Sequence, residues 1–257
     1  MLAKLRRAVR RIIPRPLDDW LDAPVVPTPQ DVDYAAAYES ALHDSERVDS
    51  FGRGRFDDGR RWRGILERAG VADGLVLDLA SGSGGVALAL AAGGRRVVTI
   101  DREWSETGRL AHRAARTPYR HVIAEASALP FKSESFAAII CLDSFEHFAD
   151  PARTSAEASR VARSGAPIAV ETPARIPNLF RRDPHYGIPC LLLLPNGMQR
   201  RLAIRRGFTQ PHQYTHRIYA SAASIGQFFP RTRILRLLGR SRFPKRWFFS
   251  AVILRRE

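Results

Sequence analysis

Apolar runs alternate with helix-length segments through the middle of this 257-residue chain. Short runs rich in Val, Ile and Leu predict buried strands, and they lie near residues 75–78, 96–101, 120–124, 136–142 and 166–171. Segments of helical spacing separate them near residues 84–92, 104–116 and 150–163. Apolar strands joined by helices predict an α/β fold, in which a parallel sheet is covered by helices on both faces.

The chain before this core predicts helices and a linker. Residues 34–42 and 60–69 read as helices, and three prolines mark residues 22–30 as a linker. Between the two helices, Gly52 to Arg55 predicts a basic loop. Two interpretations of its arginines remain open: they reach the carboxylate of a ligand, or they form a solvated turn.

The chain after the core holds a long connection and two last strands. Arg233 to Leu238 and Trp247 to Leu254 are apolar runs, and residues 221–229 predict a helix before them. Residues 172–220 exceed a normal connection between a strand and a helix. We therefore divide the chain into residues 1–60, with cap helices and linker, and a ligand-binding domain over residues 61–257, with an insertion at about 172–220.

Two acidic residues and a glycine-rich turn indicate a nucleotide site. The first strand ends in Asp78, the turn Ala80 to Gly85 follows, and the second strand ends in Asp101. This is the layout of a nucleotide-binding βαβ unit, in which small residues let the backbone approach a ligand and a carboxylate binds the ribose hydroxyls. A carboxylate at Asp78 would repel a pyrophosphate and would attract a cationic amino-acid group, so we expect no nicotinamide or flavin cofactor.

These residues resemble motif I of the class I S-adenosylmethionine (SAM)-dependent methyltransferases, of the type 11-like group. The motif is D-x-G-x-G-x-G, and here Ala80 replaces its first glycine. The substitution costs little if the φ angle of Ala80 is negative, which we expect. The resemblance implies SAM as the cofactor.

Three further blocks of the family pattern follow in order. Glu125 to Phe131 is similar to the D-A-x-x-L-P-F segment after the third strand, whose acid and following amide read the adenine. Ser135 to Leu142 is similar to the S-F-D-x-V fourth strand, although Ala137 replaces its acid. Glu146-His147 with Asp150-Pro151 matches the E-H-x-x-D-P seen after that strand in many small-molecule methyltransferases.

The resemblance implies a doubly wound, mostly parallel, seven-stranded Rossmann-like sheet. Its antiparallel last strand would insert between the fifth and the sixth. The implied cofactor-binding residues are Asp78, Ala80, Ser81, Gly82, Gly84, Asp101, Arg102, Glu125, Ala126, Leu142 and Asp143.

The acceptor site is expected at the carboxyl edge of the sheet. His147 follows the fourth strand and is the candidate base for an acceptor hydroxyl, although Glu146 and His147 could instead cap the next helix. In this superfamily the segment after the fifth strand shapes the acceptor pocket. The implied acceptor-binding residues are His185, Tyr186, His212 and Tyr214. For each histidine of the insertion, a structural role remains open.

Cysteine use and histidine spacing limit the chemistry. The two cysteines, Cys141 and Cys190, give no disulfide framework, and Cys141 falls in a predicted buried strand. A reduced cytoplasmic setting fits this pattern. The histidines never combine with cysteines or acids at a ligand spacing, so we expect no metal.

The formal net charge of +15 is unevenly placed. From Arg200 onward, fourteen Lys and Arg residues face one acid, Glu257. Met1 to Ile13 predicts an amphipathic helix with a basic face, which fits peripheral contact with an anionic membrane. Arginine-rich compositional bias and binding of nucleic acid remain alternatives.

The sequence thus predicts a SAM-dependent methyltransferase acting on a small or lipid-linked acceptor, through a hydroxyl. An RNA methyltransferase is an alternative, supported by charge alone, because no N-P-P-Y motif or RNA-binding module is visible. A non-catalytic partner subunit is another alternative. Ala80 and Ala137 favour it, whereas the intact Asp78, Gly82, Gly84 and Asp101 argue against it.

Overall fold

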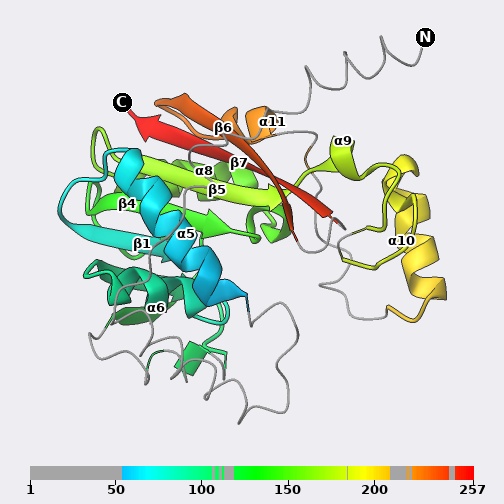
Figure 1. Cartoon of the computed structure of the whole chain (residues 1–257), viewed down its shortest axis with the longest axis horizontal. Helices are drawn as coiled ribbons and strands as arrows, with labels where there is room; N and C mark the ends of the chain where they lie inside the picture. The colour runs from blue at the N-terminus through cyan, green and yellow to red at the C-terminus, as the bar shows by residue number, and fades with distance from the viewer. Residues whose placement is uncertain are drawn as a thin grey trace.

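A seven-stranded mixed sheet forms the centre of the computed structural model, with the strand order β3-β2-β1-β4-β5-β7-β6 (Figure 1). The residues that the structure describes are 54–105, 108, 109, 112, 119–183, 185–208, 219, 222–242 and 247–257. The expected amphipathic helix at Met1 to Ile13, the linker over 22–30 and the helix over 34–42 lie outside them.

Five parallel strands form one half of the sheet and its centre. They are β1 (Leu75–Leu79), β2 (Arg96–Asp101), β3 (Arg120–Ile123), β4 (Phe136–Leu142) and β5 (Pro167–Pro173). The five predicted strands are confirmed to within two residues at each end. Their order places β1 and β4 side by side, so the acidic end of β1 adjoins the segment after β4.

The last two strands extend the sheet with opposite directions. β6 (Thr232–Arg242) pairs only with β7 (Trp247–Arg256) among the described strands, and β7 also pairs with β5, antiparallel in both cases. The antiparallel last strand therefore inserts between the fifth and the sixth, as the resemblance implied. A short helix, α11 (Ala222–Gly226), precedes β6.

Helices cover both faces of the sheet because alternate strand residues point to opposite sides. On one face, α5 (Arg55–Arg68) and α6 (Gly85–Ala92) contribute Trp62, Ile65 and Leu90 to a core with Val76 and Ile140. α5 begins five residues before the predicted helix over 60–69.

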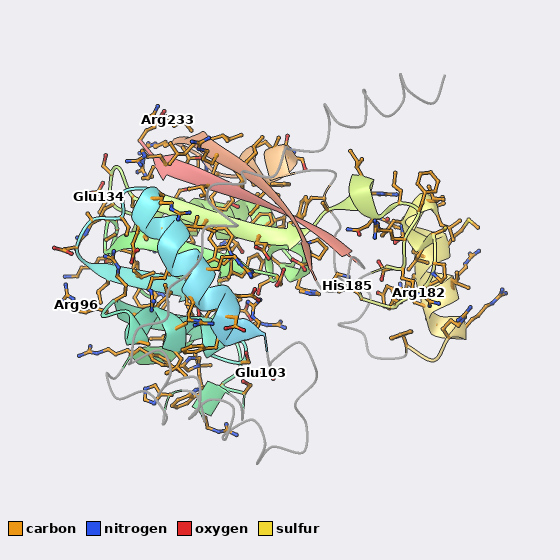
Figure 2. All side chains as sticks on the ribbon, viewed as in Figure 1. Arg96, Glu103, Glu134, Arg182, His185 and Arg233 are labelled. Atoms are coloured by element: carbon orange, nitrogen blue, oxygen red, sulfur yellow. The ribbon has the colours of Figure 1, made fainter. Side chains whose placement is uncertain are left out.

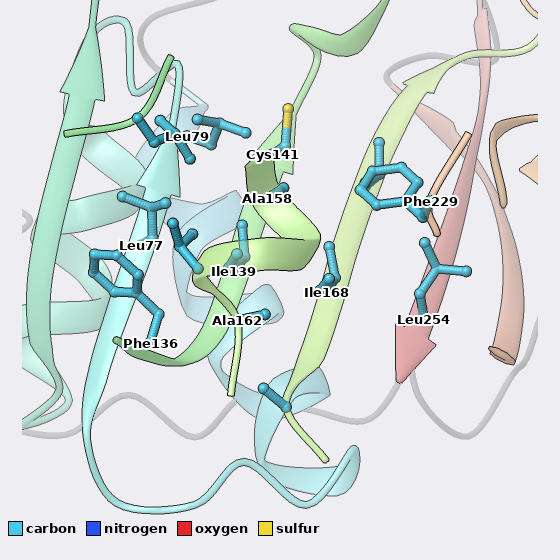
Figure 3. Close-up of a cluster of buried hydrophobic side chains, with 14 of the residues drawn as sticks. Leu77, Leu79, Phe136, Ile139, Cys141, Ala158, Ala162, Ile168, Phe229 and Leu254 are labelled. Carbon is cyan, nitrogen blue, oxygen red and sulfur yellow. The ribbon is translucent and has the colours of Figure 1, made fainter. Parts of the chain in front are cut away.

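On the other face, α8 (Pro151–Val161) and α11 pack on the neighbouring strand residues (Figure 3). Leu77, Ile139 and Cys141 point to this side and belong to the same buried cluster as Ala158. Cys141 is buried, as expected, and Cys190 is exposed.

The insertion forms a helical lobe at the end of the sheet toward which β4 and β5 point (Figure 1). It contains α9 (Arg175–Asn178), the 3₁₀ turn η2 (Leu191–Leu193) and α10 (Asn196–Arg205). Sequence reasoning predicted the extra length but not these helices. Among the described residues, no helix is both long and apolar enough to cross a membrane.

Candidate active site

The glycine-rich turn after β1 depends on left-handed backbone conformations. Ala80, Gly82 and Gly84 have φ angles of 60°, 51° and 76°. The expectation of a negative φ at Ala80 is therefore wrong. The family's glycine would adopt this conformation without strain, whereas an L-residue pays about 1–2 kcal/mol there. The substitution is tolerated at a cost in stability.

Asp101 lies against this turn, where a ribose-binding carboxylate was expected. The Gly82 backbone N–H donates to Asp101 Oδ2 over 2.9 Å. The Ser81 N–H donates to the carbonyl of Ile100 over 3.1 Å. The turn after β1 is thus held to the end of β2, and the carboxylate faces the most exposed part of the turn. This arrangement fits a nucleoside at the edge between the two strands.

Asp78 is a buried carboxylate beneath the same turn. Its relative exposure is 3%, and its Oδ2 has no hydrogen-bond partner. Burial raises the pKa of Asp78 to about 7, and the charge of Asp101 adds to the rise, while Arg55 opposes it. A buried, unpartnered carboxylate oxygen is costly unless a ligand satisfies it. The site therefore fits the cationic amino-acid group of SAM.

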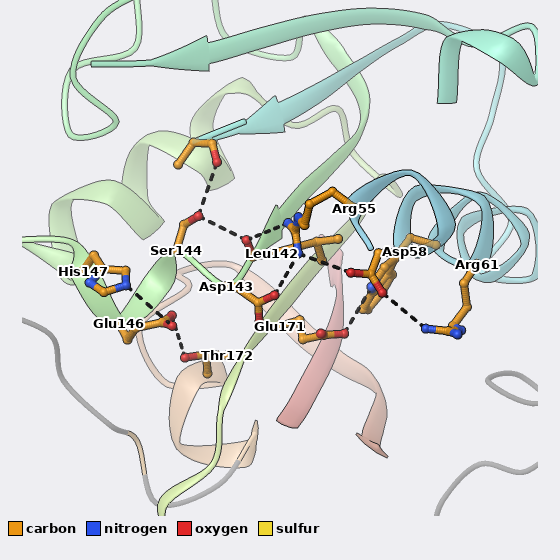
Figure 4. A network of polar contacts seen from close by, with 12 residues as sticks. Arg55, Asp58, Arg61, Leu142, Asp143, Ser144, Glu146, His147, Glu171 and Thr172 are labelled. Atoms are coloured by element: carbon orange, nitrogen blue, oxygen red, sulfur yellow. Dashed lines mark hydrogen bonds and ion pairs between the residues drawn. The ribbon is translucent and has the colours of Figure 1, made fainter. Parts of the chain in front are cut away.

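Arg55, which the sequence analysis assigned to a basic loop, is the first residue of helix α5. Its guanidinium donates to Asp143 Oδ2 over 2.8 Å and to the carbonyl of Leu142 over 3.2 Å, and it lies 3.5 Å from Asp58 (Figure 4). The interpretation of a solvated turn is wrong for this arginine, because it is buried. No local signal reveals a pairing across 88 residues of sequence.

The remaining expected cofactor residues all lie at this edge of the sheet. Arg102 is exposed after β2, and Glu125 is exposed after β3, with Ala126 half-buried beside it. Leu142 is buried at the end of β4. Asp143 follows with a positive φ of 54°. Ser81 and Gly84 are buried within the turn. The cofactor set is thus gathered around the ends of β1, β2, β3 and β4.

A second group of polar residues joins the segment after β4 to the insertion. Glu146 and His147 lie in the 3₁₀ turn η1 (Phe145–His147), and His185 comes from the insertion (Figures 2 and 4). Glu146 Oε1 lies 3.9 Å from His147 Nε2 and 3.7 Å from His185 Nε2. The two imidazole rings meet edge to face, with centroids 5.1 Å apart. We call Glu146, His147 and His185 the histidine cluster.

The carboxylate of the histidine cluster is buried and fixed. Glu146 has a relative exposure of 1%, and the Thr172 hydroxyl donates to its Oε2 over 2.8 Å. Burial raises the pKa of Glu146, but the interaction with His185 and the charge of His147 outweigh it, so the pKa lies below its ordinary value. The carboxylate is therefore ionised at neutral pH. Neither Glu146 nor His147 caps α8, because Asp150 accepts the Arg153 N–H there.

The insertion holds His185 in place through a buried turn. Asp183 Oδ1 accepts the backbone N–H groups of His185 and Tyr186, over 2.9 and 2.7 Å. Tyr186 is half-buried, and its ring lies 6.4 Å from that of His185. Of the four expected acceptor residues, His185 thus contacts His147, and Tyr186 lies beside His185. His212 and Tyr214 lie outside the described residues.

A family model described as a methyltransferase domain matches residues 77–170, from β1 into β5. A ubiquinone biosynthesis O-methyltransferase from Aromatoleum aromaticum is 32% identical to this chain over 112 residues. Residues 77–170 therefore match a methyltransferase domain, as the motifs predicted. The alignment covers 42% of this chain and 47% of that relative, so the chain spans less than half of the relative's length.

Solved structures share the fold of this methyltransferase domain. A SAM-dependent methyltransferase from Methanosarcina mazei has a TM-score of 0.52 at 21% identity, over 75% of this chain and 96% of that one. A geranyl diphosphate C-methyltransferase from Streptomyces coelicolor, solved with Mg²⁺, geranyl diphosphate and S-adenosylhomocysteine (SAH), has a TM-score of 0.54 at 14% identity. That match covers 90% of this chain and 100% of the other. The resemblance inferred from the motifs, with SAM as cofactor, is confirmed at the level of the family.

Proposed function

We propose that the chain transfers a methyl group from SAM to a hydroxyl oxygen of a small or lipid-linked acceptor. The observation that carries this proposal is the histidine cluster, which lies at the same sheet edge as the glycine-rich turn. The O-methyltransferase relative supports oxygen as the atom that is methylated.

The donor side of the proposed reaction rests on binding and orientation. SAM supplies a methyl group that is already activated on a sulfonium. Asp78 and Asp101 would hold its amino-acid and ribose groups, and the turn from Ala80 to Gly84 would allow close approach of the backbone. Alignment and exclusion of water are the main tasks of the protein in such a transfer.

The acceptor side requires removal of a proton. A neutral hydroxyl is a weak nucleophile, so its O–H proton must leave as the oxygen attacks the methyl carbon. Glu146 is an ionised, buried carboxylate beside two imidazoles, and such a group favours proton transfer to a histidine. His147 is 44% exposed and His185 is 18% exposed at the side chain, so both remain within reach of an acceptor.

The surface of the insertion favours a lipid-linked acceptor and peripheral contact with an anionic membrane. Four large apolar side chains of this lobe are exposed: Phe180, Leu193, Met198 and Ile204. Exposed arginines accompany them on α10, at Arg200, Arg201 and Arg205. Apolar side chains interleaved with basic ones suit an interface of anionic lipid better than RNA, which would favour stacking aromatics.

Methyl transfer from labelled SAM tests this function. The full chain is incubated with water-soluble hydroxyl compounds, with anionic vesicles that carry extracted lipids, and with RNA, and the labelled product is identified. We expect label on a hydroxyl oxygen of a small or lipid-linked compound. Label found only on RNA, or on no fraction, would contradict the proposal.

Variants connect this transfer to the histidine cluster. We expect His147→Ala or His185→Ala to lower turnover by about 10²–10⁴-fold, the usual contribution of acid–base catalysis, if that residue moves the proton. SAH affinity should not change in either variant. His112→Ala is a matched control, because it removes an imidazole that contacts the Tyr119 carbonyl instead. Full turnover in both cluster variants would place proton removal elsewhere.

A further inference from the structure

The histidine cluster has the composition of a metal site. Glu146, His147 and His185 each bring one ligand atom, and these three atoms lie within 4.8 Å of one another. Neutral imidazole and carboxylate are the ligands of many catalytic zinc sites, which use two histidines and one glutamate and leave one position open. The sequence did not indicate a metal, because His185 arrives from the insertion rather than at a local ligand spacing.

The separations within the cluster suit a shared cation better than direct hydrogen bonds. Glu146 Oε1 is 3.7 Å from His185 Nε2 and 3.9 Å from His147 Nε2. A direct N–H···O bond spans about 2.7–3.2 Å, so both separations are too long for one. Ligand atoms about 2.0–2.1 Å from a tetrahedral zinc ion stand roughly 3.3–3.4 Å apart. Both rings would have to move inward to bring their nitrogens to this separation from Glu146 Oε1.

The Glu146 carboxylate is positioned by its neighbours in the way that metal-binding carboxylates usually are. Glu146 is buried, and its second oxygen accepts a hydrogen bond from the Thr172 hydroxyl. Hydrogen bonds of this kind orient ligands in metal sites. Asp183 accepts the backbone N–H of His185 in the insertion, and the turn η1 carries Glu146 and His147. Two separate elements thus converge on one buried oxygen.

We propose that Glu146, His147 and His185 bind one divalent cation of the zinc class, with the acceptor hydroxyl as its fourth ligand. The cation accepts a lone pair of the hydroxyl oxygen and lowers the pKa of that hydroxyl, so its proton leaves to water without any change of oxidation state. The role in catalysis rests on the proposed function, whereas the cation site itself does not.

Calorimetry with Zn²⁺ on the full chain, after removal of metals with a chelator, tests the site. We expect one Zn²⁺ per chain to bind at this cluster. His147→Ala, His185→Ala and Glu146→Gln should each weaken this binding at least 100-fold. Thr172→Val, which removes only the orienting hydroxyl, should weaken it about 10–100-fold, the usual effect of losing such a partner. His121→Ala, which alters an imidazole bonded to Thr99, should leave it unchanged.

Binding of SAH, measured on the same samples, separates this proposal from the proposed function. Each variant should keep the wild-type SAH affinity, which also shows that it is folded. Equal Zn²⁺ binding by wild type and by all three ligand variants would overturn the cation site. Failure of Zn²⁺ to bind, with SAH bound normally, would overturn it too and would leave histidine alone to accept the proton. Zn²⁺ binding without SAH binding would support the cation site and contradict the methyltransferase function.

Discussion

The glycine-rich turn and the histidine cluster lie at the same edge of the sheet, but they are assembled differently. The turn is made by a continuous stretch, Asp78 to Gly84, and is tied to Asp101 one strand away. The cluster joins η1 to an insertion that follows β5. The shape of the glycine-rich turn therefore depends on local backbone geometry. The histidine cluster depends on how distant segments of the chain pack together.

This difference separates the part of the site that the sheet holds in place from the part that the insertion contributes. A turn between two central strands is fixed by the sheet itself. An insertion can change in length and sequence without disturbing the strands, because it lies beyond their ends. Changes on the donor side should alter SAH affinity or stability, whereas changes in the histidine cluster should alter cation binding and turnover.

Replacement of Arg55 should have the largest effect on stability. Arg55→Ala removes the positive charge that pairs with the buried carboxylate of Asp143. The negative charges of Asp143, Asp58 and Asp78 would then lack this positive partner. Breaking a buried ion pair in this way costs about 3–5 kcal/mol. Urea unfolding measures this change in the free energy of unfolding.

Arg60→Ala provides the matched control for Arg55. Arg60 lies on the same helix and pairs with the exposed Asp57. An exposed pair contributes about 0–1 kcal/mol, so this variant should remain close to the wild type. Equal losses in the two variants would show that the buried network has no special role.

Asp78 should make the stability of the ligand-free chain fall as the pH rises. Its pKa of about 7 in the folded chain exceeds the ordinary value of 3.8, so the folded state holds the proton more tightly. The contribution of Asp78 to the free energy of unfolding is greatest below about pH 4. It declines as the pH rises toward 7 and is constant above that.

Asp78→Asn isolates this contribution. Between pH 5 and pH 8, the wild type should lose about 3 kcal/mol more than the variant, from 1.36 kcal/mol per unit over two units of pH. Urea unfolding at the two pH values measures the difference, and other titrating groups cancel because both proteins contain them. Parallel pH profiles would mean that Asp78 is not the buried, unpartnered carboxylate described above.

Ala80→Gly should change the free energy of unfolding least of these variants, and it should raise it. Glycine relieves the left-handed strain of about 1–2 kcal/mol at φ 60° but adds about 0.5–1 kcal/mol of unfolded-state entropy. The net expectation is a stabilisation of about 0.5–1 kcal/mol in thermal or urea unfolding. Ala87→Gly, within helix α6, should be destabilising instead. A loss of stability in Ala80→Gly would show that the turn is not strained.

Local patterns were enough to predict the sheet, and they predict a set of cofactor-binding residues that the structure brings to one edge of it. The five parallel strands follow from short apolar runs, and Asp78, Gly82 and Asp101 follow from a motif within one βαβ unit. The φ angle of Ala80 was mispredicted, because residue type alone does not fix the conformation that a turn requires. Helices α9 and α10 were not predicted, because apolar residues do not recur at a regular helical spacing in the insertion.

Long-range pairings could not be predicted from the sequence. The contact of Arg55 with Asp143 depends on how α5 packs at the ends of the strands. The approach of His185 to Glu146 depends on the path of the insertion. His147 and His185 were each identified as candidates, but the shared buried carboxylate that joins them appears only in the folded chain.

Titration of the full chain with SAH, beside Asp101→Ala, tests the central claim most directly. We predict that the wild type binds SAH and that the variant binds it at least tenfold more weakly, because a charge-assisted hydrogen bond contributes about 1.5–3 kcal/mol. Glu103→Ala, an exposed acid two residues away, should bind like the wild type. The same titration with NAD should give no binding. Unchanged SAH affinity in Asp101→Ala, or binding of NAD in preference to SAH, would contradict the assignment of this edge of the sheet as the SAM site.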